Sequence, residues 1–217
     1  MAFCKRQGLF DDTFDQGRRS FRHSVWLHGI EGVVRRAAPR CLHLPVGQPD
    51  DRGGGTGVFA ITLCQAFPDL SATIVDFPNV ADIGAEYVDD AGLADRIDYV
   101  PGNALDPTWP HKQDVILMSY LFSGVPVERH NELISRAHNH LAPGGRLLFH
   151  DSVVSADRTG PKLADLWRLQ HTAFTPHARS LDDAWLTDAL ETAGFDDISV
   201  EPMIPGMTML AQAEKPN

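Results

Sequence analysis

From residue 53 onward, hydrophobic and polar residues follow two alternating periodicities, one typical of helices and one of strands. Between Gly57 and Phe67 apolar residues recur at helical spacing and Pro68 follows, so we expect a helix there. Residues 71–77, SATIVDF, are a short β-branched run that predicts a strand. Residues 114–122, DVILMSYLF, are almost continuously apolar, which is typical of a strand covered on both faces.

The rest of the chain continues this alternation. Further helices are predicted over residues 78–93, 128–141, 162–173 and 181–194, and further strands over 96–105 and 146–154. Residues 197–215 read as two strands joined by a turn at Pro205 and Gly206. Strands that alternate with helices predict an α/β fold, with a mostly parallel sheet, helices on both faces and an antiparallel hairpin at one edge.

Composition narrows the class of protein. The chain has 217 residues, 43% of them hydrophobic and 22% charged, as expected for one globular domain. A formal net charge of −10 argues against nucleic acid or an anionic membrane as a partner. No apolar run approaches the roughly 20 residues that span a bilayer, and the first residues lack the apolar centre of a signal peptide. Three cysteines without CxxC spacing suit a reducing compartment, so we expect a cytoplasmic location.

A glycine-rich turn, GGGTG at residues 53–57, opens the first predicted helix. Glycine lets the backbone approach a cofactor closely at the start of a helix. Asp76 follows at the end of the next predicted strand, where an acid can accept both ribose hydroxyls of an adenosine. The spacing fits neither GxGxxG nor a P-loop, which disfavours a nicotinamide dinucleotide and a nucleoside triphosphate.

These and later motifs resemble one family. The segments GGGTGVFA, FPDLSATIVDFPNV, GLADRIDYVPGNAL, DVILMSYLF, AHNHLAPGGRLLFHDSVV and TDALETAGF resemble class I S-adenosylmethionine (SAM)-dependent methyltransferases. More narrowly, they resemble the small-molecule O-methyltransferases of plant phenolic and bacterial natural-product pathways. The resemblance covers residues 53–213 and implies a Rossmann-like, seven-stranded sheet, SAM as cofactor and a small-molecule acceptor.

The resemblance also implies roles for individual residues. Gly53, Gly55 and Gly57 would approach the methionine end of SAM, and Asp76 would hold the ribose. Phe77 would pack near the adenine. The loop at Gly102, Asn103 and Ala104 stands where the family has Gly-Asp-x-Phe, so Asn103 would contact the adenine amine. Ser119 and Tyr120, at the end of the fourth strand, would face the sulfonium.

The family's usual proton acceptor is missing. A histidine that follows the fourth strand in the plant enzymes is replaced here by Phe122, and His130, further along, is expected to face solvent. The segment FHD instead places His150 and Asp151 at the end of a strand, and His171 follows in a later helix. Three interpretations stay open. His150 or His171 is a general base for O- or N-methylation; His150, Asp151 and His171 hold a divalent or iron ion for C-methylation of an α-keto acid; or these side chains bind no ion.

The segment before the glycine turn lacks a recognisable strand. It reads CLHLPVGQPDDR, with prolines that are disfavoured in a central strand. We therefore interpret residues 1–52 as a remnant or out-of-frame segment and residues 53–217 as the SAM-binding catalytic domain. On this interpretation the sheet lacks its central strand, and the family's N-terminal dimerisation region is missing. A non-catalytic SAM-binding remnant and a Rossmann-like dehydrogenase are the alternatives.

Overall fold

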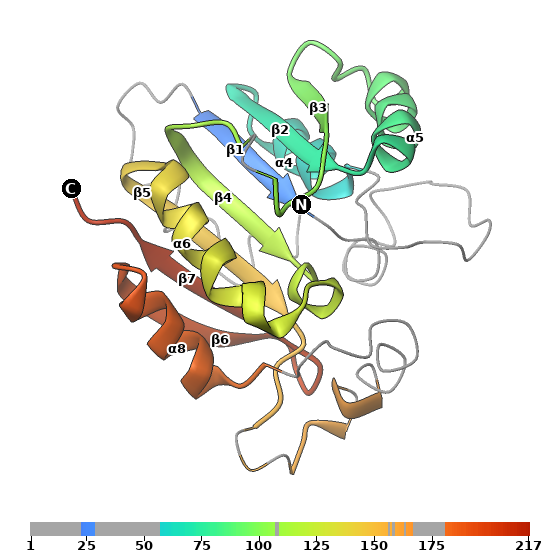
Figure 1. The fold of residues 1–217 in the computed structure, drawn as a ribbon. Helices are drawn as coiled ribbons and strands as arrows, with labels where there is room; N and C mark the ends of the chain where they lie inside the picture. Colours follow the sequence, from blue (N-terminus) through green and yellow to red (C-terminus); the bar gives the residue numbers. More distant parts are fainter. Residues whose placement is uncertain are drawn as a thin grey trace.

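A single sheet organises the molecule. The computed structural model describes residues 57–106, 109–155, 157, 159–162, 164–166 and 181–217, together with the backbone of residues 23–28. These residues form a seven-stranded sheet with helices on both faces, which confirms the predicted α/β class. In Figure 1, helices α6 and α8 cross in front of the strands and α4 lies behind them. No helix in the described ranges has the length and hydropathy needed to cross a membrane.

The strand order is β3-β2-β1-β4-β5-β7-β6. Strands β1 to β5 are parallel, and β7 pairs antiparallel with both β5 and β6. The strands are β1 (His23–His28), β2 (Leu70–Asp76), β3 (Ile97–Pro101), β4 (Gln113–Ser119), β5 (Leu141–Asp151), β6 (Asp196–Ile204) and β7 (Thr208–Glu214). The helices are α4 (Val58–Ala66), α5 (Pro78–Asp90), α6 (His130–His140) and α8 (Asp183–Thr192), with short 3-10 turns η1 (Phe122–Gly124) and η2 (Val127–Arg129).

The central strand is present, so the prediction that the sheet lacks it is wrong. Strand β1 lies between β2 and β4, in parallel register with Leu70–Ile74 on one side and Val115–Met118 on the other. The resemblance predicts this strand directly before Gly53, but residues 23–28, well upstream, occupy the position. Backbone hydrogen bonds define a strand, and their partners here are distant in sequence, so local patterning did not reveal it.

Local sequence signals set several element boundaries. Pro78 opens α5, where its missing N–H costs no helical hydrogen bond. Asp182 caps α8, because its Oδ1 accepts a 2.7 Å hydrogen bond from the backbone N–H of Trp185. Between β6 and β7, Pro205 and Gly206 occupy the two central positions of a tight turn, and Gly206 has φ +74°. The predicted C-terminal hairpin is thus confirmed.

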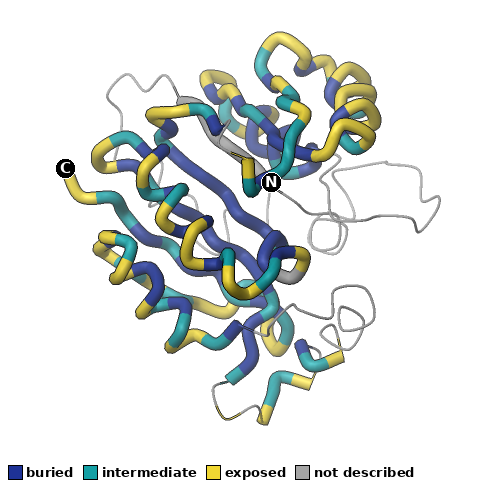
Figure 2. Tube along the Cα trace, in the orientation of Figure 1, coloured by how far each residue is buried: buried dark blue, intermediate teal, exposed yellow. Residues whose placement is uncertain are grey.

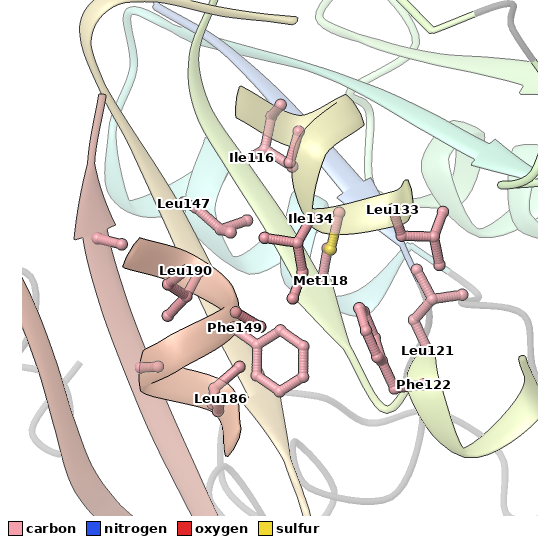
Figure 3. Close-up of a cluster of buried hydrophobic side chains, with 14 of the residues drawn as sticks. Ile116, Met118, Leu121, Phe122, Leu133, Ile134, Leu147, Phe149, Leu186 and Leu190 are labelled. Carbon is pink, nitrogen blue, oxygen red and sulfur yellow. The ribbon is translucent and has the colours of Figure 1, made fainter. Parts of the chain in front are cut away.

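The sheet separates two hydrophobic clusters, because successive side chains of a strand point to opposite faces. On one face, α6 and α8 cover Ile116, Met118, Leu147 and Phe149 (Figure 3). On the other face, α4 and α5 cover a cluster that includes Leu117 and Leu148. Strand β4 is buried along most of its length (Figure 2), as its apolar sequence predicted.

Candidate functional site

Parallel strands place their carboxyl ends at one edge of the sheet, and the predicted site residues gather there. Asp76 ends β2, Ser119 ends β4, and His150 and Asp151 end β5. Asp76, Ser119 and His150 share the face covered by α4 and α5, since they are in phase with the cluster residues Ile74, Leu117 and Leu148. Crevices beyond the carboxyl ends of parallel strands are where open α/β sheets bind ligands.

Asp76 is almost fully buried, with 1% of its surface exposed. Its Oδ1 accepts a 2.6 Å hydrogen bond from the backbone N–H of Phe77. Its backbone carbonyl accepts a 2.7 Å bond from the N–H of Gly102, which ties the loop after β3 to the end of β2. The ring of Phe77 is 45% exposed beside this carboxylate. A buried acceptor next to an available aromatic face suits a nucleoside.

Gly57 stands at the start of α4 with φ +78°, a left-handed conformation that disfavours other residues. A Cβ at this position would lie 2.7 Å from the hydroxyl oxygen of Tyr99. Glycine is therefore required here both by the backbone conformation and by the space available. Gly53 and Gly55, the other predicted cofactor residues of the turn, lie outside the described residues.

The loop after β3 is held by local hydrogen bonds. The side-chain oxygen of Asn103, the residue predicted to contact the adenine, accepts a 2.9 Å hydrogen bond from the N–H of Leu105. One of the two lone pairs of this oxygen is therefore already used. Ala104 is buried, and its carbonyl accepts bonds from the indole of Trp109 at 2.9 Å and from Arg136 at 3.1 Å. The loop is thus anchored to α6 and to the chain that enters β4.

Ser119 and His150 pair across β4 and β5, where they are also register partners. The Oγ of Ser119 lies 2.7 Å from Nδ1 of His150, and both residues are 1% exposed. The ring of Tyr120 meets the imidazole edge-on, with centroids 5.1 Å apart, and its N–H donates a 2.8 Å bond to the carbonyl of His150. Tyr120 holds this position with φ +49°, an uncommon conformation for a non-glycine residue. Ser119 and Tyr120, predicted to face the sulfonium, thus both contact His150.

Asp151 points to the opposite face of the sheet. It is in phase with Phe149, its Oδ1 accepts a 2.7 Å bond from the N–H of Ser152, and it also accepts from the N–H of Phe122. Phe122 is fully buried on that face, against Phe149, with ring centroids 4.8 Å apart. The position of the family's histidine is therefore filled by an apolar ring that Asp151 anchors through the backbone.

This arrangement does not fit the predicted metal site. One ion cannot bind His150 and Asp151 together while their side chains leave the strand on opposite faces. Within the part of the chain that the structure describes, no three His, Cys, Asp or Glu side chains lie close enough to hold an ion. His171, the third predicted ligand, lies outside the described residues.

Burial controls the ionisation of both strand-end side chains. It lowers the pKa of His150 to about 4. It raises the pKa of Asp151 to about 7, although hydrogen bonds from the N–H groups of Ser152 and Phe122 oppose the rise. Two buried atoms, Nε2 of His150 and Oδ2 of Asp151, have no hydrogen-bond partner among the described residues.

Sequence reasoning missed two residues near this edge. Tyr99 lies against Gly57 and Gly84, and burial, followed by the charge of Asp76, raises the pKa of its phenol. His130, predicted to face solvent, is buried; its Nε2 lies 3.0 Å from the carbonyl oxygen of Val125, and its ring packs on Phe122. The helical spacing of His130 with Leu133, Ile134 and Ala137 is the signal that could have placed it on the buried face of α6.

Comparison with known sequences places the chain among methyltransferases. It is 30% identical over 190 residues to 3-hydroxy-5-methyl-1-naphthoate 3-O-methyltransferase of Streptomyces sahachiroi, covering 86% of this chain and 54% of the relative. It is also 30% identical over 161 residues to L-tyrosine C(3)-methyltransferase of Streptomyces lavendulae, covering 73% of this chain and 44% of the relative. The chain spans about half the length of the curated relatives it matches.

Solved structures share the fold. An O-methyltransferase family 2 protein of Planctomyces limnophilus, in complex with apigenin, superposes with a TM-score of 0.67 at 28% identity, covering 80% of this chain and 55% of that one. Human N-acetylserotonin methyltransferase, in complex with SAM, gives a TM-score of 0.68 at 19% identity, covering 89% of this chain and 48% of that one. The pattern of the O-methyltransferase domain family matches residues 33–196. The chain therefore belongs to the O-methyltransferase domain family.

Proposed function

We propose that this chain carries the SAM-binding catalytic domain of a methyltransferase that acts on a small natural-product-type acceptor. The observation that carries the proposal is the buried carboxylate of Asp76 at the end of β2, on the face where α4 begins at Gly57. Family membership supports the same reaction class. A dehydrogenase is disfavoured, because the glycine spacing does not fit a dinucleotide and the family match points elsewhere.

The residues at this edge fit the cofactor. Asp76 would accept the ribose hydroxyls, Phe77 would cover one face of the adenine, and Gly57 would let the chain pass close to the methionine end together with Gly53 and Gly55. The loop at Gly102, Asn103 and Ala104 would line the adenine edge. When bound, SAM supplies an electrophilic methyl group on its sulfonium.

The acceptor that we propose is a small hydroxylated aromatic compound. One relative is named for methylation of a hydroxynaphthoate oxygen and another for methylation of a tyrosine ring carbon. Both hydroxynaphthoate and tyrosine have an aromatic ring that carries a hydroxyl group. Methyl transfer to oxygen needs a group that receives the hydroxyl proton. We place His150 in that role because its Nε2, at the carboxyl edge, has no hydrogen-bond partner among the described residues. The geometry of His150 and Asp151 gives no support to metal-assisted chemistry at this pair.

The domain that we propose consists of residues 53–217 together with strand β1. The interpretation of the upstream residues as out of frame stays a prediction, although the family match begins at residue 33, inside that segment. Resequencing the coding DNA tests it, and the interpretation fails if no single-base shift yields an apolar strand before Gly53. The cytoplasmic location likewise stays a prediction.

Isothermal titration with SAM tests the proposal. We expect wild-type protein to bind SAM and Asp76→Asn to bind it at least about 30-fold more weakly, since a buried charged hydrogen-bond acceptor contributes about 2 kcal/mol. Asp82→Asn is the matched control, because Asp82 is exposed on α5. Absence of SAM binding at millimolar cofactor would overturn the proposal. Transfer of a labelled methyl group to a panel of phenols and hydroxylated aromatic acids then identifies the acceptor class.

A further inference from the structure

The two imidazole nitrogens of His150 have different hydrogen-bonding environments. Nδ1 lies 2.7 Å from the hydroxyl oxygen of Ser119, whereas Nε2 is buried without a hydrogen-bond partner in the described part of the chain. Native proteins rarely leave a buried polar atom unpaired, and such atoms are often part of a functional site. His150 lies near the end of β5, so its buried Nε2 lies at the carboxyl edge of the sheet, where open α/β sheets bind ligands.

The unpaired atom also indicates the tautomer. A proton on Nε2 would leave a buried N–H donor without an acceptor, and orphaned buried donors are rarer than under-satisfied acceptors. A proton on Nδ1 lets this nitrogen donate to the Oγ of Ser119 and leaves a lone pair on Nε2. Because no described group can accept a proton from Nε2, the pairing with Ser119 favours the neutral imidazole whose Nε2 carries the lone pair.

We propose that Ser119 is a positioning residue that holds His150 as the Nδ1–H tautomer, so that Nε2 receives the proton of a hydroxyl acceptor during methyl transfer. This inference rests on the proposed function and identifies the acceptor as a hydrogen-bond donor. Tyr120 supports the same geometry, because its ring and its N–H both contact His150. Neither Asp151, on the other face, nor Phe122 takes part in the proton transfer.

The step balances in atoms and charge. The acceptor oxygen forms a bond to the methyl carbon as the electrons of the S–C bond return to sulfur. The acceptor O–H bond breaks, and its proton passes to Nε2 of His150. A positive charge thus disappears from sulfur as one appears on the imidazole, so the site keeps its net charge although burial disfavours an isolated imidazolium. The proton leaves to solvent with product release.

Nitrogen NMR of protein labelled at histidine tests the tautomer without any ligand. We expect His150, assigned by comparison with His150→Asn, to show a protonated Nδ1 and an unprotonated Nε2. Ser119→Ala should mix the tautomers or reverse the preference, whereas Ser119→Thr, which keeps the hydroxyl, should retain the wild-type signal. A wild-type His150 with its proton on Nε2 overturns the inference.

Kinetics provide the second readout. His150→Asn retains an amide that can reach Ser119 but lacks the Nε2 position, and we expect kcat to fall about 100-fold. Ser119→Ala should lower kcat about 10-fold with SAM affinity unchanged within twofold, and Ser119→Thr should restore most of the rate. The matched control is Ser135→Ala, at an exposed position of α6.

The outcomes separate the two proposals. If wild-type protein fails to bind SAM, the proposed function fails. If wild-type protein binds SAM and methylates a phenol while Ser119→Ala keeps full kcat, the positioning role of Ser119 is wrong. A Ser119→Ala variant that loses SAM affinity instead of kcat likewise contradicts it, and indicates that the serine contacts the cofactor.

Discussion

The ionisable side chains at the two edges of the sheet differ in their hydrogen bonding. At the edge where the parallel strands begin, Arg96 donates through Nη1 to the carbonyls of Phe67, Pro68 and Leu70 at 3.3, 2.8 and 3.3 Å. Lys215 donates to the carbonyl of Leu141 at 2.9 Å. At the edge where the strands end, Nε2 of His150 and Oδ2 of Asp151 are buried without partners in the described residues.

This difference distinguishes side chains that stabilise the fold from side chains that are candidates for ligand binding. Charged side chains at the first edge donate hydrogen bonds to backbone carbonyls near the strand ends, so they lower the free energy of the folded state. Unpaired buried groups at the second edge raise it, since each lost its hydration without replacement. Substitutions at the first edge should therefore destabilise the protein without changing its ligand affinity, whereas substitutions at the second should change how its stability depends on pH.

The largest expected effect concerns Asp151 and pH. Its pKa is raised from 3.8 to about 7, so its contribution to stability is fully present below pH 4 and is lost as pH rises through 7. Asp151→Asn has no such loss. The stability of the variant relative to wild type should thus increase by up to about 1.4 kcal/mol per pH unit between pH 4 and 7. Urea unfolding at several pH values measures this difference, and a pH-independent difference would contradict it.

His150 should show the opposite slope. Its pKa is lowered from 6.5 to about 4, so its contribution is present above pH 6.5 and is lost as pH falls towards 4. The stability advantage of wild type over His150→Asn should therefore shrink by up to about 1.4 kcal/mol per unit as pH falls through this window. In wild type the two slopes cancel between pH 4 and 6.5, so its stability changes little while the single variants diverge. If both variants respond in the same direction, the assigned burial of one side chain is wrong.

Arg96→Ala tests the opposite edge. Loss of charged hydrogen bonds to three carbonyls should lower the free energy of unfolding by about 2 kcal/mol. The affinity for SAM, measured by titration at a temperature where both proteins are folded, should stay within twofold of wild type. Arg129→Ala is the control, because Arg129 pairs with Glu132 at the surface, so its loss should leave stability unchanged. An Arg96→Ala variant with normal stability would contradict the claim that charged side chains at this edge stabilise the fold.

The smallest expected effect lies between the edges, where α5 crosses β3. A Cβ on Gly84 would collide with the ring and hydroxyl of Tyr99. Gly84→Ala should therefore destabilise the protein by about 1 kcal/mol, because overpacking outweighs the gain in helix propensity. Adding Tyr99→Leu should remove the collision, so the double variant should be more stable than the sum of the single effects predicts. Gly124→Ala, with no atom within 4 Å of the new Cβ, is the control.

Much of the fold could be predicted because its signals are local. The proline that opens α5, the aspartate that caps α8 and the Pro205–Gly206 turn each act within a few residues. The position of β1 could not be predicted in this way. Its hydrogen bonds go to β2 and β4, and no feature near residues 23–28 specifies those partners.

The sequence predicted that individual side chains lie at strand ends, but not how these side chains are arranged. Asp76, Ser119 and His150 lie at the predicted edge, but the pairing of Ser119 with His150 depends on the register of β4 with β5. The grouping of His150 with Asp151 around one ion is not supported, since adjacent strand residues point to opposite faces of the sheet. Asp151 accepts a hydrogen bond from the backbone N–H of Phe122, a contact that depends on the packing of this phenylalanine against β5.

The position of β1 has a consequence for how the sheet assembles. Its register pairs join His23 to Leu70 and Val25 to Val115, so every one of its interstrand contacts spans a long stretch of chain. Contacts of this kind incur the entropy of closing a large loop before any stabilisation is gained, which slows their formation. Strand β1 should therefore complete the sheet after β4 and β5 have paired. Hydrogen-exchange protection of its amides would report the moment at which the two halves of the sheet become one cooperative unit.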